Sequence, residues 1–298
     1  MKKNDKLELA QWAVDYAIKH GADQSAASIS RRRNVEIQHR DGKLEKIQES
    51  TSNSLDLNIY ANHRYSGHST CDLKKTSLEK FIKEAVAMTK YLSEDEYRKL
   101  PDPELYEGQK DIDLEITDPS YQELTSEKRV EIAKQIEEMA HSVSDKIISA
   151  TAGCGDSFSE SVKVHSNGFV GERIGTSFYA GAEATVEGEE GKRPEDWYYA
   201  SCRYFNQLPA ADFLGKQAAE RALKKIGQDK IKSDKMIMLV ENRTARRLLY
   251  AMRRPLSGRA LQQKSSFLEG KLNEKIASEK LTLIDDPFIK KGLGSRLY

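Results

Sequence analysis

The stretch VEIQHRDGKLEKI, residues 35–47, decides how the front of the chain folds. Its two arms alternate apolar and polar residues on either side of Asp41-Gly42, a dipeptide that favours the tight turn of a β-hairpin. Residues 55–60 (LDLNIY) continue this alternation, which is typical of a strand with one buried face. We therefore predict an antiparallel sheet built around this hairpin.

Helical periodicity flanks these strands on both sides. Apolar spacing predicts helices over residues 5–19 and 74–90, and residues 67–71 extend a further strand. Residues 100–121 carry three prolines and many acidic residues, and they read as a long connection without regular structure.

The same order then recurs along the chain. Helices are predicted over residues 126–141, with Thr125 as the N-cap, and over residues 209–226. Asn167-Gly168 repeats the hairpin signal between them. The strand-like stretches are 147–152, 159–165, 170–186 and 197–204. We predict an α+β fold in which an N-terminal domain, residues 1–228, duplicates one unit over about 1–100 and 120–228.

The character of the chain changes at residue 229. The run MIMLV (236–240) predicts a strand buried on both faces, residues 243–254 a helix, and residues 281–284 a second short strand. We expect residues 229–298 to begin a mainly β C-terminal domain. Seventy residues are few for such a core, so we expect this domain to be truncated at residue 298.

Composition excludes several classes of protein. The chain has 48 basic and 47 acidic residues, and this balance argues against nucleic acid or an anionic membrane as a partner. The amino terminus does not resemble a signal peptide, and no apolar run approaches the length of a membrane span. Three widely spaced cysteines do not form a disulfide framework, which favours a cytoplasmic location.

Motif spacing assigns no metal site and no nucleophile. The two closest of the six histidines, His63 and His68, fall on opposite faces of a predicted strand, so we interpret the histidines as structural. The sequence contains no pair of cysteines or histidines at the spacing of a zinc site, and no serine nucleophile elbow. Gly292-Leu293-Gly294-Ser295 lacks the spacing of a phosphate-binding loop and is interpreted as a turn. From Asp229 onward the chain contains no histidine and no cysteine.

A basic run marks the predicted helix over residues 243–254. An anionic partner or a subunit interface would use its arginines, whereas the alternative is a solvated helix face. The balanced net charge favours the second interpretation. The arginines are Arg243, Arg246, Arg247, Arg253 and Arg254.

Several segments resemble the TldD/PmbA family. The most specific is KSSFLEGKLNEKIASEKLTLIDDP (264–287), within a similar stretch that starts at Met236 and is followed by GLGSRLY (292–298). LPDPELY (100–106), VKVHSNG (162–168) and GKQAAERALKKIG (215–227) extend the resemblance over nearly the whole chain.

The resemblance implies a particular subfamily. TldD-like subunits are zinc metallopeptidases with an H-E-x-x-x-H helix, and PmbA (TldE)-like subunits lack that motif. Alignment on the leucine pair 248–249 places Tyr250 and Pro255 at the two histidine positions and Ala251 at the glutamate position. The chain thus resembles a PmbA/TldE-like subunit with no catalytic or metal-binding residues of its own, and zinc is expected only in a TldD-like partner.

This resemblance implies a non-catalytic subunit of a TldD-type zinc metallopeptidase complex that processes or degrades unfolded peptides. Whether it pairs with a TldD-like subunit or with itself, and whether it has any activity alone, stays open. The alternative is a binding module that modulates DNA gyrase or nucleic acid without proteolysis, since the family is also labelled a modulator of DNA gyrase. A hydrolase with an unrecognised nucleophile is a third reading, which no spacing supports.

Overall fold

The computed structural model describes residues 3–106 and 112–297. The chain divides into two compact units: unit 1 comprises Met1–Gln228 with Asp286–Tyr298, and unit 2 comprises Asp229–Asp285. The start of unit 2 coincides with the boundary expected near residue 229. Residues 286–298, expected in the C-terminal domain, group instead with unit 1.

Unit 1 contains the same element order twice, which confirms the predicted α+β fold with a duplicated helix–strands–helix arrangement. The first half consists of α1 (Lys3–Lys19), β1 (Gln24–Arg40), β2 (Lys43–Ala61), β3 (Arg64–Thr70) and α2 (Lys75–Thr89). The second half consists of α3 (Ser126–Ser142), β4 (Ile147–His165), β5 (Val170–Val186), β6 (Glu195–Cys202) and α4 (Ala211–Leu223). The connection between them includes short 3-10 helices at Pro103–Tyr106 and Pro119–Glu123, and its predicted irregular part includes residues 107–111, which lie outside the described residues.

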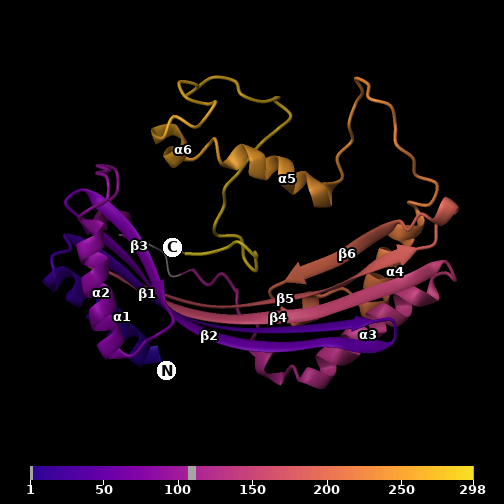
Figure 1. The fold of residues 1–298 in the computed structure, drawn as a ribbon, viewed down its shortest axis with the longest axis horizontal. Coiled ribbons are helices and arrows are strands. Elements are labelled where there is room, and N and C mark those ends of the chain that lie inside the picture. The colour runs from indigo at the N-terminus through magenta and orange to yellow at the C-terminus, as the bar shows by residue number, and fades with distance from the viewer. Residues whose placement is uncertain (1–2, 107–111, 298) are drawn as a thin grey trace. The chain divides into compact units, whose positions relative to one another are not determined.

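All six strands form one antiparallel sheet in the order β3-β2-β1-β4-β5-β6. The central pair, β1 and β4, joins the two halves, and each half contributes its remaining strands outward (Figure 1). Helices α1 and α2 pack on one end of the sheet and α3 and α4 on the other. Ile29 faces the first helix pair and Ile37 the second, so both pairs cover the same face of β1.

The hairpin turns form where the dipeptides predicted them. Asp41 and Gly42 have φ values of 46° and 78°, and this left-handed pair closes β1 onto β2. Gly168, with φ of 95°, lies in the turn between β4 and β5. Thr125 caps α3 as predicted, because its side chain accepts a hydrogen bond from the Lys128 amide at 3.2 Å.

The two halves fill their cores with different residues. Under α1 and α2 the core is aliphatic, with Ile29, Leu55, Leu57, Ile59, Leu78 and Ile82 completely buried. Under α3 and α4 it is mainly alanine, with Ala133, Ala152, Ala180, Ala182 and Ala218 around Ile136 and Leu214. Gly215 of α4 permits close helix contact, because a Cβ there would collide with the Ile136 carbonyl oxygen of α3.

Unit 2 corrects two of the predicted strands. Among its described residues it has helices α5 (Asn242–Arg253) and α6 (Gly258–Gln262) and no strand, so residues 236–240 and 281–284 are not strands. Ile237 and Leu239 are 99% and 98% exposed. A strand exists only when a neighbour accepts its backbone hydrogen bonds, and unit 2 supplies no such neighbour to this apolar run.

In the part of the chain that the structure describes, no helix is both long and apolar enough to cross a membrane.

Candidate functional site

Helix α5 carries residues that the family resemblance predicts to stand at the positions of a zinc-peptidase motif. Tyr250 and Ala251 lie in its last turn and are exposed, and Pro255 lies two residues beyond its last residue, Arg253. The Arg253 guanidinium lies 4.9 Å from the centre of the Tyr250 ring. Tyrosine and proline are not zinc ligands of the usual sets, and alanine has no carboxylate to act as a base. These residues do not fit a zinc ion.

The arginines of α5 form one face of the helix. At 100° per residue, Arg243, Arg246, Arg247 and Arg253 fall within an arc of about 120°, and Leu248, Leu249 and Met252 fall on the other side. Within unit 2, Arg246, Arg247, Arg253 and the following Arg254 are exposed, whereas Arg243 is partly buried and lies 2.9 Å from Glu241. This basic surface is able to contact an anion, and its partner stays a prediction.

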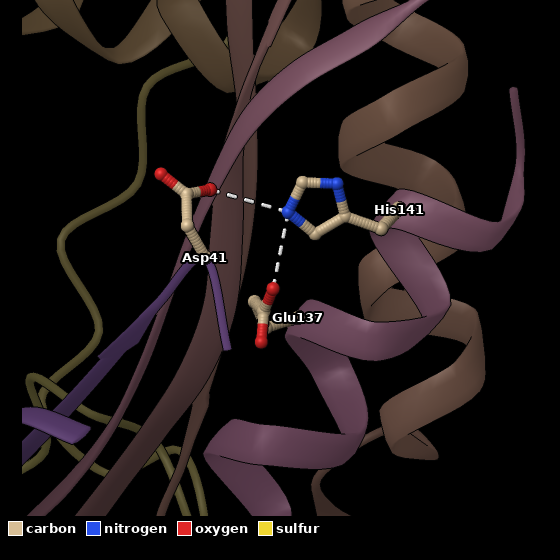
Figure 2. A group of neighbouring side chains, drawn as sticks. All are labelled: Asp41, Glu137 and His141. Carbon is tan, nitrogen blue, oxygen red and sulfur yellow. Dashed lines mark hydrogen bonds and ion pairs between the residues drawn. The ribbon is translucent and has the colours of Figure 1, made fainter. Parts of the chain in front are cut away.

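A second group of functional side chains lies at the turn end of the β1–β2 hairpin. Figure 2 shows Asp41 of this turn beside Glu137 and His141 of α3. We name these three residues the hairpin-end cluster. Nε2 of His141 lies 3.2 Å from Oδ1 of Asp41 and 3.0 Å from Oε1 of Glu137. Glu137 and His141 are four residues apart, so one helix face presents both side chains.

Neighbouring groups hold both carboxylates in place. Burial tends to raise the pKa of Asp41, but hydrogen bonds from the Ala150 amide, the Ser149 hydroxyl and His141 outweigh it and lower that pKa. Glu137 is 2% exposed, and its Oε2 lies 2.9 Å from Nδ1 of His39. The site therefore combines two fixed carboxylates with two imidazoles.

The spacing of the histidines predicts structural roles for His39 and His141, and it does not reveal this group. A detectable signal was present: a Glu-x-x-x-His spacing on a predicted helix, together with an aspartate in a predicted hairpin turn. Only the tertiary fold shows that the turn and the helix meet.

A buried ion pair lies between the two core regions of unit 1. Nε of Arg129 lies 2.5 Å from Oδ2 of Asp156, and both side chains are 1% exposed. The Tyr121 hydroxyl donates to Asp156 at 2.7 Å, and burial, followed by Asp156, raises the pKa of Tyr121 to about 12. Because solvent does not reach these groups, we interpret them as a structural link between α3 and β4.

The sheet face opposite the helices carries aromatic residues at its β5–β6 end. Trp197 and Tyr199 of the terminal strand β6 are 36% and 38% exposed, with ring centroids 6.3 Å apart. The Tyr199 ring lies against Gly181, where a Cβ would collide with it. Burial, followed by the charges of Glu183 and Glu36, raises the pKa of Tyr199, so its hydroxyl stays a hydrogen-bond donor.

Family models match two parts of the chain. Residues 119–226 match the PmbA/TldA metallopeptidase central domain, and residues 233–298 match the PmbA/TldA metallopeptidase C-terminal domain. Among curated proteins, the metalloprotease PmbA homolog of Haemophilus influenzae is 24% identical over 98% of this chain, and metalloprotease PmbA of Escherichia coli O157:H7 is 25% identical over 92%. The chain spans 65% and 60% of the lengths of these two relatives.

Solved structures share the fold. A candidate modulator of DNA gyrase from Bacteroides thetaiotaomicron is 38% identical and superposes with a TM-score of 0.92, covering 99% of this chain and 67% of its own. Another from Thermotoga maritima is 19% identical with a TM-score of 0.77 over 97% of this chain and 64% of its own. TldE from Thermococcus kodakarensis has a TM-score of 0.60 at 14% identity, over 72% of this chain and 47% of its own. The last two show similarity of fold alone.

Proposed function

The chain belongs to the PmbA/TldD metallopeptidase family, and we propose that within it this chain is a non-catalytic, PmbA/TldE-like subunit. Its role is to assemble with a zinc-bearing TldD-like subunit, or with a second copy of itself, and to hold unfolded peptide for cleavage. We place this role in the cytoplasm, where a free, exposed thiol such as that of Cys71 is compatible with the reducing environment.

The composition of α5 carries the proposal. Tyr250, Ala251 and Pro255 occupy the positions where an active subunit has two histidine ligands and a glutamate base. Replacing all three removes both ligands and the base, so a zinc-bound water has no place on this helix. Catalysis in such a complex must then come from the other subunit.

The exposed face of the β5–β6 end supports a role in peptide binding. Strand β6 is a terminal strand of the sheet, and an extended peptide can add to such an edge through main-chain hydrogen bonds. Trp197 and Tyr199 lie next to this edge and offer apolar rings with polar tips. A peptide bound there gains both backbone pairing and side-chain contact.

The test uses an unstructured, internally quenched fluorescent peptide with zinc in the buffer. We expect the chain alone to show no cleavage, to co-elute with a subunit that carries H-E-x-x-x-H, and to increase cleavage by that subunit. Zinc-dependent cleavage by the chain alone would contradict the proposal.

Paired variants test the peptide-binding surface in the same assay. Trp197→Ala together with Tyr199→Ala should raise KM about fivefold to thirtyfold, because each lost ring contact is worth about 0.5–1 kcal/mol. Tyr91→Ala is the matched control, since Tyr91 is 90% exposed and lies beyond α2 in the other half. Equal KM values for the Trp197→Ala/Tyr199→Ala variant and the Tyr91→Ala variant would contradict a role of this surface in peptide binding.

The arginine face of α5 supports a second candidate function, a binding module for DNA gyrase or DNA. Two solved relatives of the fold are described as candidate gyrase modulators. If DNA is the ligand, its affinity should fall steeply with salt and weaken further in Arg246→Ala and Arg253→Ala. An affinity for gyrase or DNA that is unchanged in both variants would contradict this candidate function.

A further inference from the structure

The hairpin-end cluster has a charge imbalance that points to a ligand. Its two carboxylates, from Asp41 and Glu137, converge on one ring nitrogen of His141. That nitrogen carries at most one proton, so it donates well to only one of the two oxygens. The two carboxylates bring two negative charges to this nitrogen, one of them on a glutamate that is 2% exposed. A divalent cation would neutralise both.

The distances fit coordination of a metal ion. The three ligand atoms lie within 4.8 Å of one another, and the two nitrogen–oxygen separations are 3.0 and 3.2 Å. Ligands about 2.1 Å from a common ion are about 3.0 Å apart in octahedral and about 3.4 Å apart in tetrahedral geometry. The two nitrogen–oxygen separations therefore match those of ligands that share one ion.

The surroundings orient the ligands as they do in metal sites. The Ala150 amide and the Ser149 hydroxyl hold the Asp41 carboxylate, each at 3.0 Å. His39 lies behind Glu137, with its Nδ1 2.9 Å from the oxygen that does not face His141. Such partners behind the ligands fix their direction and raise their affinity for the ion.

The cluster is open to solvent on one side. The side chains of Asp41 and His141 are 46% and 33% exposed, so an ion can enter and water can complete its coordination. One imidazole with two carboxylates favours a late first-row ion over Mg²⁺ or Ca²⁺, which prefer oxygen ligands alone.

We propose that Asp41, Glu137 and His141 form a binding site for Zn²⁺ or a similar transition-metal ion, separate from any metallopeptidase centre. The ion joins the β1–β2 hairpin turn to α3 and so fixes the first half of unit 1 to the second. This site is independent of the proposed subunit role and does not require peptidase activity.

The experiment measures Zn²⁺ binding to the full chain, free of affinity tags and first treated with a chelator. Titration calorimetry should detect one high-affinity Zn²⁺ per chain, Co²⁺ should give a visible d–d absorption band, and Zn²⁺ should raise Tm. Excess Mg²⁺ should not compete. A chain that binds no Zn²⁺ at stoichiometric concentration, or one in which Mg²⁺ displaces Zn²⁺, overturns the proposal.

Variants locate the ion. Asp41→Asn and His141→Gln change partly exposed ligands, and each should weaken Zn²⁺ binding at least about tenfold and abolish the Tm shift. Glu138→Gln and His63→Asn are matched controls: Glu138 is the exposed neighbour of Glu137 on α3, and His63 has a positive φ that asparagine also adopts. Circular dichroism checks that each variant is folded. Unchanged affinity in both ligand variants overturns the proposal.

Discussion

The two halves of unit 1 share one topology and reach it with different packing. The first half packs large isoleucine and leucine side chains of its strands and α2 beside the alanines of α1, whereas the second brings α3 and α4 close together over alanine and glycine. A repeated fold therefore constrains the order and pairing of elements more than the residues that fill its core. The halves should accordingly respond to opposite kinds of substitution.

The largest effect should come from adding volume to the second half. Gly215→Leu places a side chain against the backbone of α3, where even a Cβ lies about 3.0 Å from Met139 Cβ, and should destabilise by about 4 kcal/mol. Urea unfolding measures the change. Gly258→Ala is the control, because no atom lies within 4 Å of a Cβ there, and a similar loss in that variant would contradict the packing argument.

Removing volume should matter most in the first half. Leu57 is completely buried among aliphatic neighbours, so Leu57→Ala leaves a cavity and should cost about 3 kcal/mol in urea unfolding. Ile47→Ala, on the same strand but at a residue that is 58% exposed, should cost less than about 0.5 kcal/mol. Equal losses would show that burial does not determine the difference.

The stability of the protein should depend on pH because of His165, which lies on β4 where the two halves meet. Burial, followed by the charge of Lys163, lowers its pKa from 6.5 to about 4, and the Tyr106 hydroxyl lies 2.9 Å from its Nδ1. Between these pH values the unfolded chain binds the proton and the folded chain does not, so stability falls as pH decreases from about 6.5 to 4. The loss should be about 3 kcal/mol. Unfolding curves of His165→Asn should lack this component, and an unchanged pH slope would contradict the assignment.

The smallest expected change in stability comes from the N-caps of the helices. Thr125 caps α3 with its side chain, whereas Lys74, at the corresponding position of α2, makes no such hydrogen bond. Thr125→Ala should destabilise by about 1 kcal/mol, and Lys74→Asp should stabilise by about 0.5 kcal/mol, both measured by thermal unfolding. An unchanged Tm in both variants would contradict this difference between the two caps.

The sequence predicted the parts of the fold that depend on local patterns. Asp41-Gly42, Asn167-Gly168 and the Thr125 cap carry their geometry in their own chemistry, and they appear where expected. Strand β4 was predicted in two pieces, because residues 153–158 (GCGDSF) lack alternation. It is continuous because β1 and β5 pair with it on both sides.

The wrong strand prediction and the unpredicted hairpin-end cluster have a common physical cause. The run 236–240 is apolar enough for a buried strand, but burial and pairing require a neighbour that the pattern does not reveal. The hairpin-end cluster joins residues about a hundred positions apart, and no local spacing connects Asp41 to His141. The assignment of Tyr250, Ala251 and Pro255 to motif positions stays a prediction from the sequence, and the zinc-dependent cleavage assay tests it.

The pairing of β1 with β4 also has a consequence for folding kinetics. The turns at Asp41-Gly42 and Gly168 join strands that are adjacent in the sequence, so the β1–β2 and β4–β5 hairpins should form early. The pairing of β1 with β4 brings together residues that are far apart in the sequence, such as Arg33 and Phe158, and should form late. Until β1 and β4 pair, each hairpin exposes one long strand edge, and the same edge can pair with the matching strand of another copy of the chain. Refolding should therefore be concentration-sensitive, and strand-exchanged dimers should accumulate when the protein is refolded at high concentration.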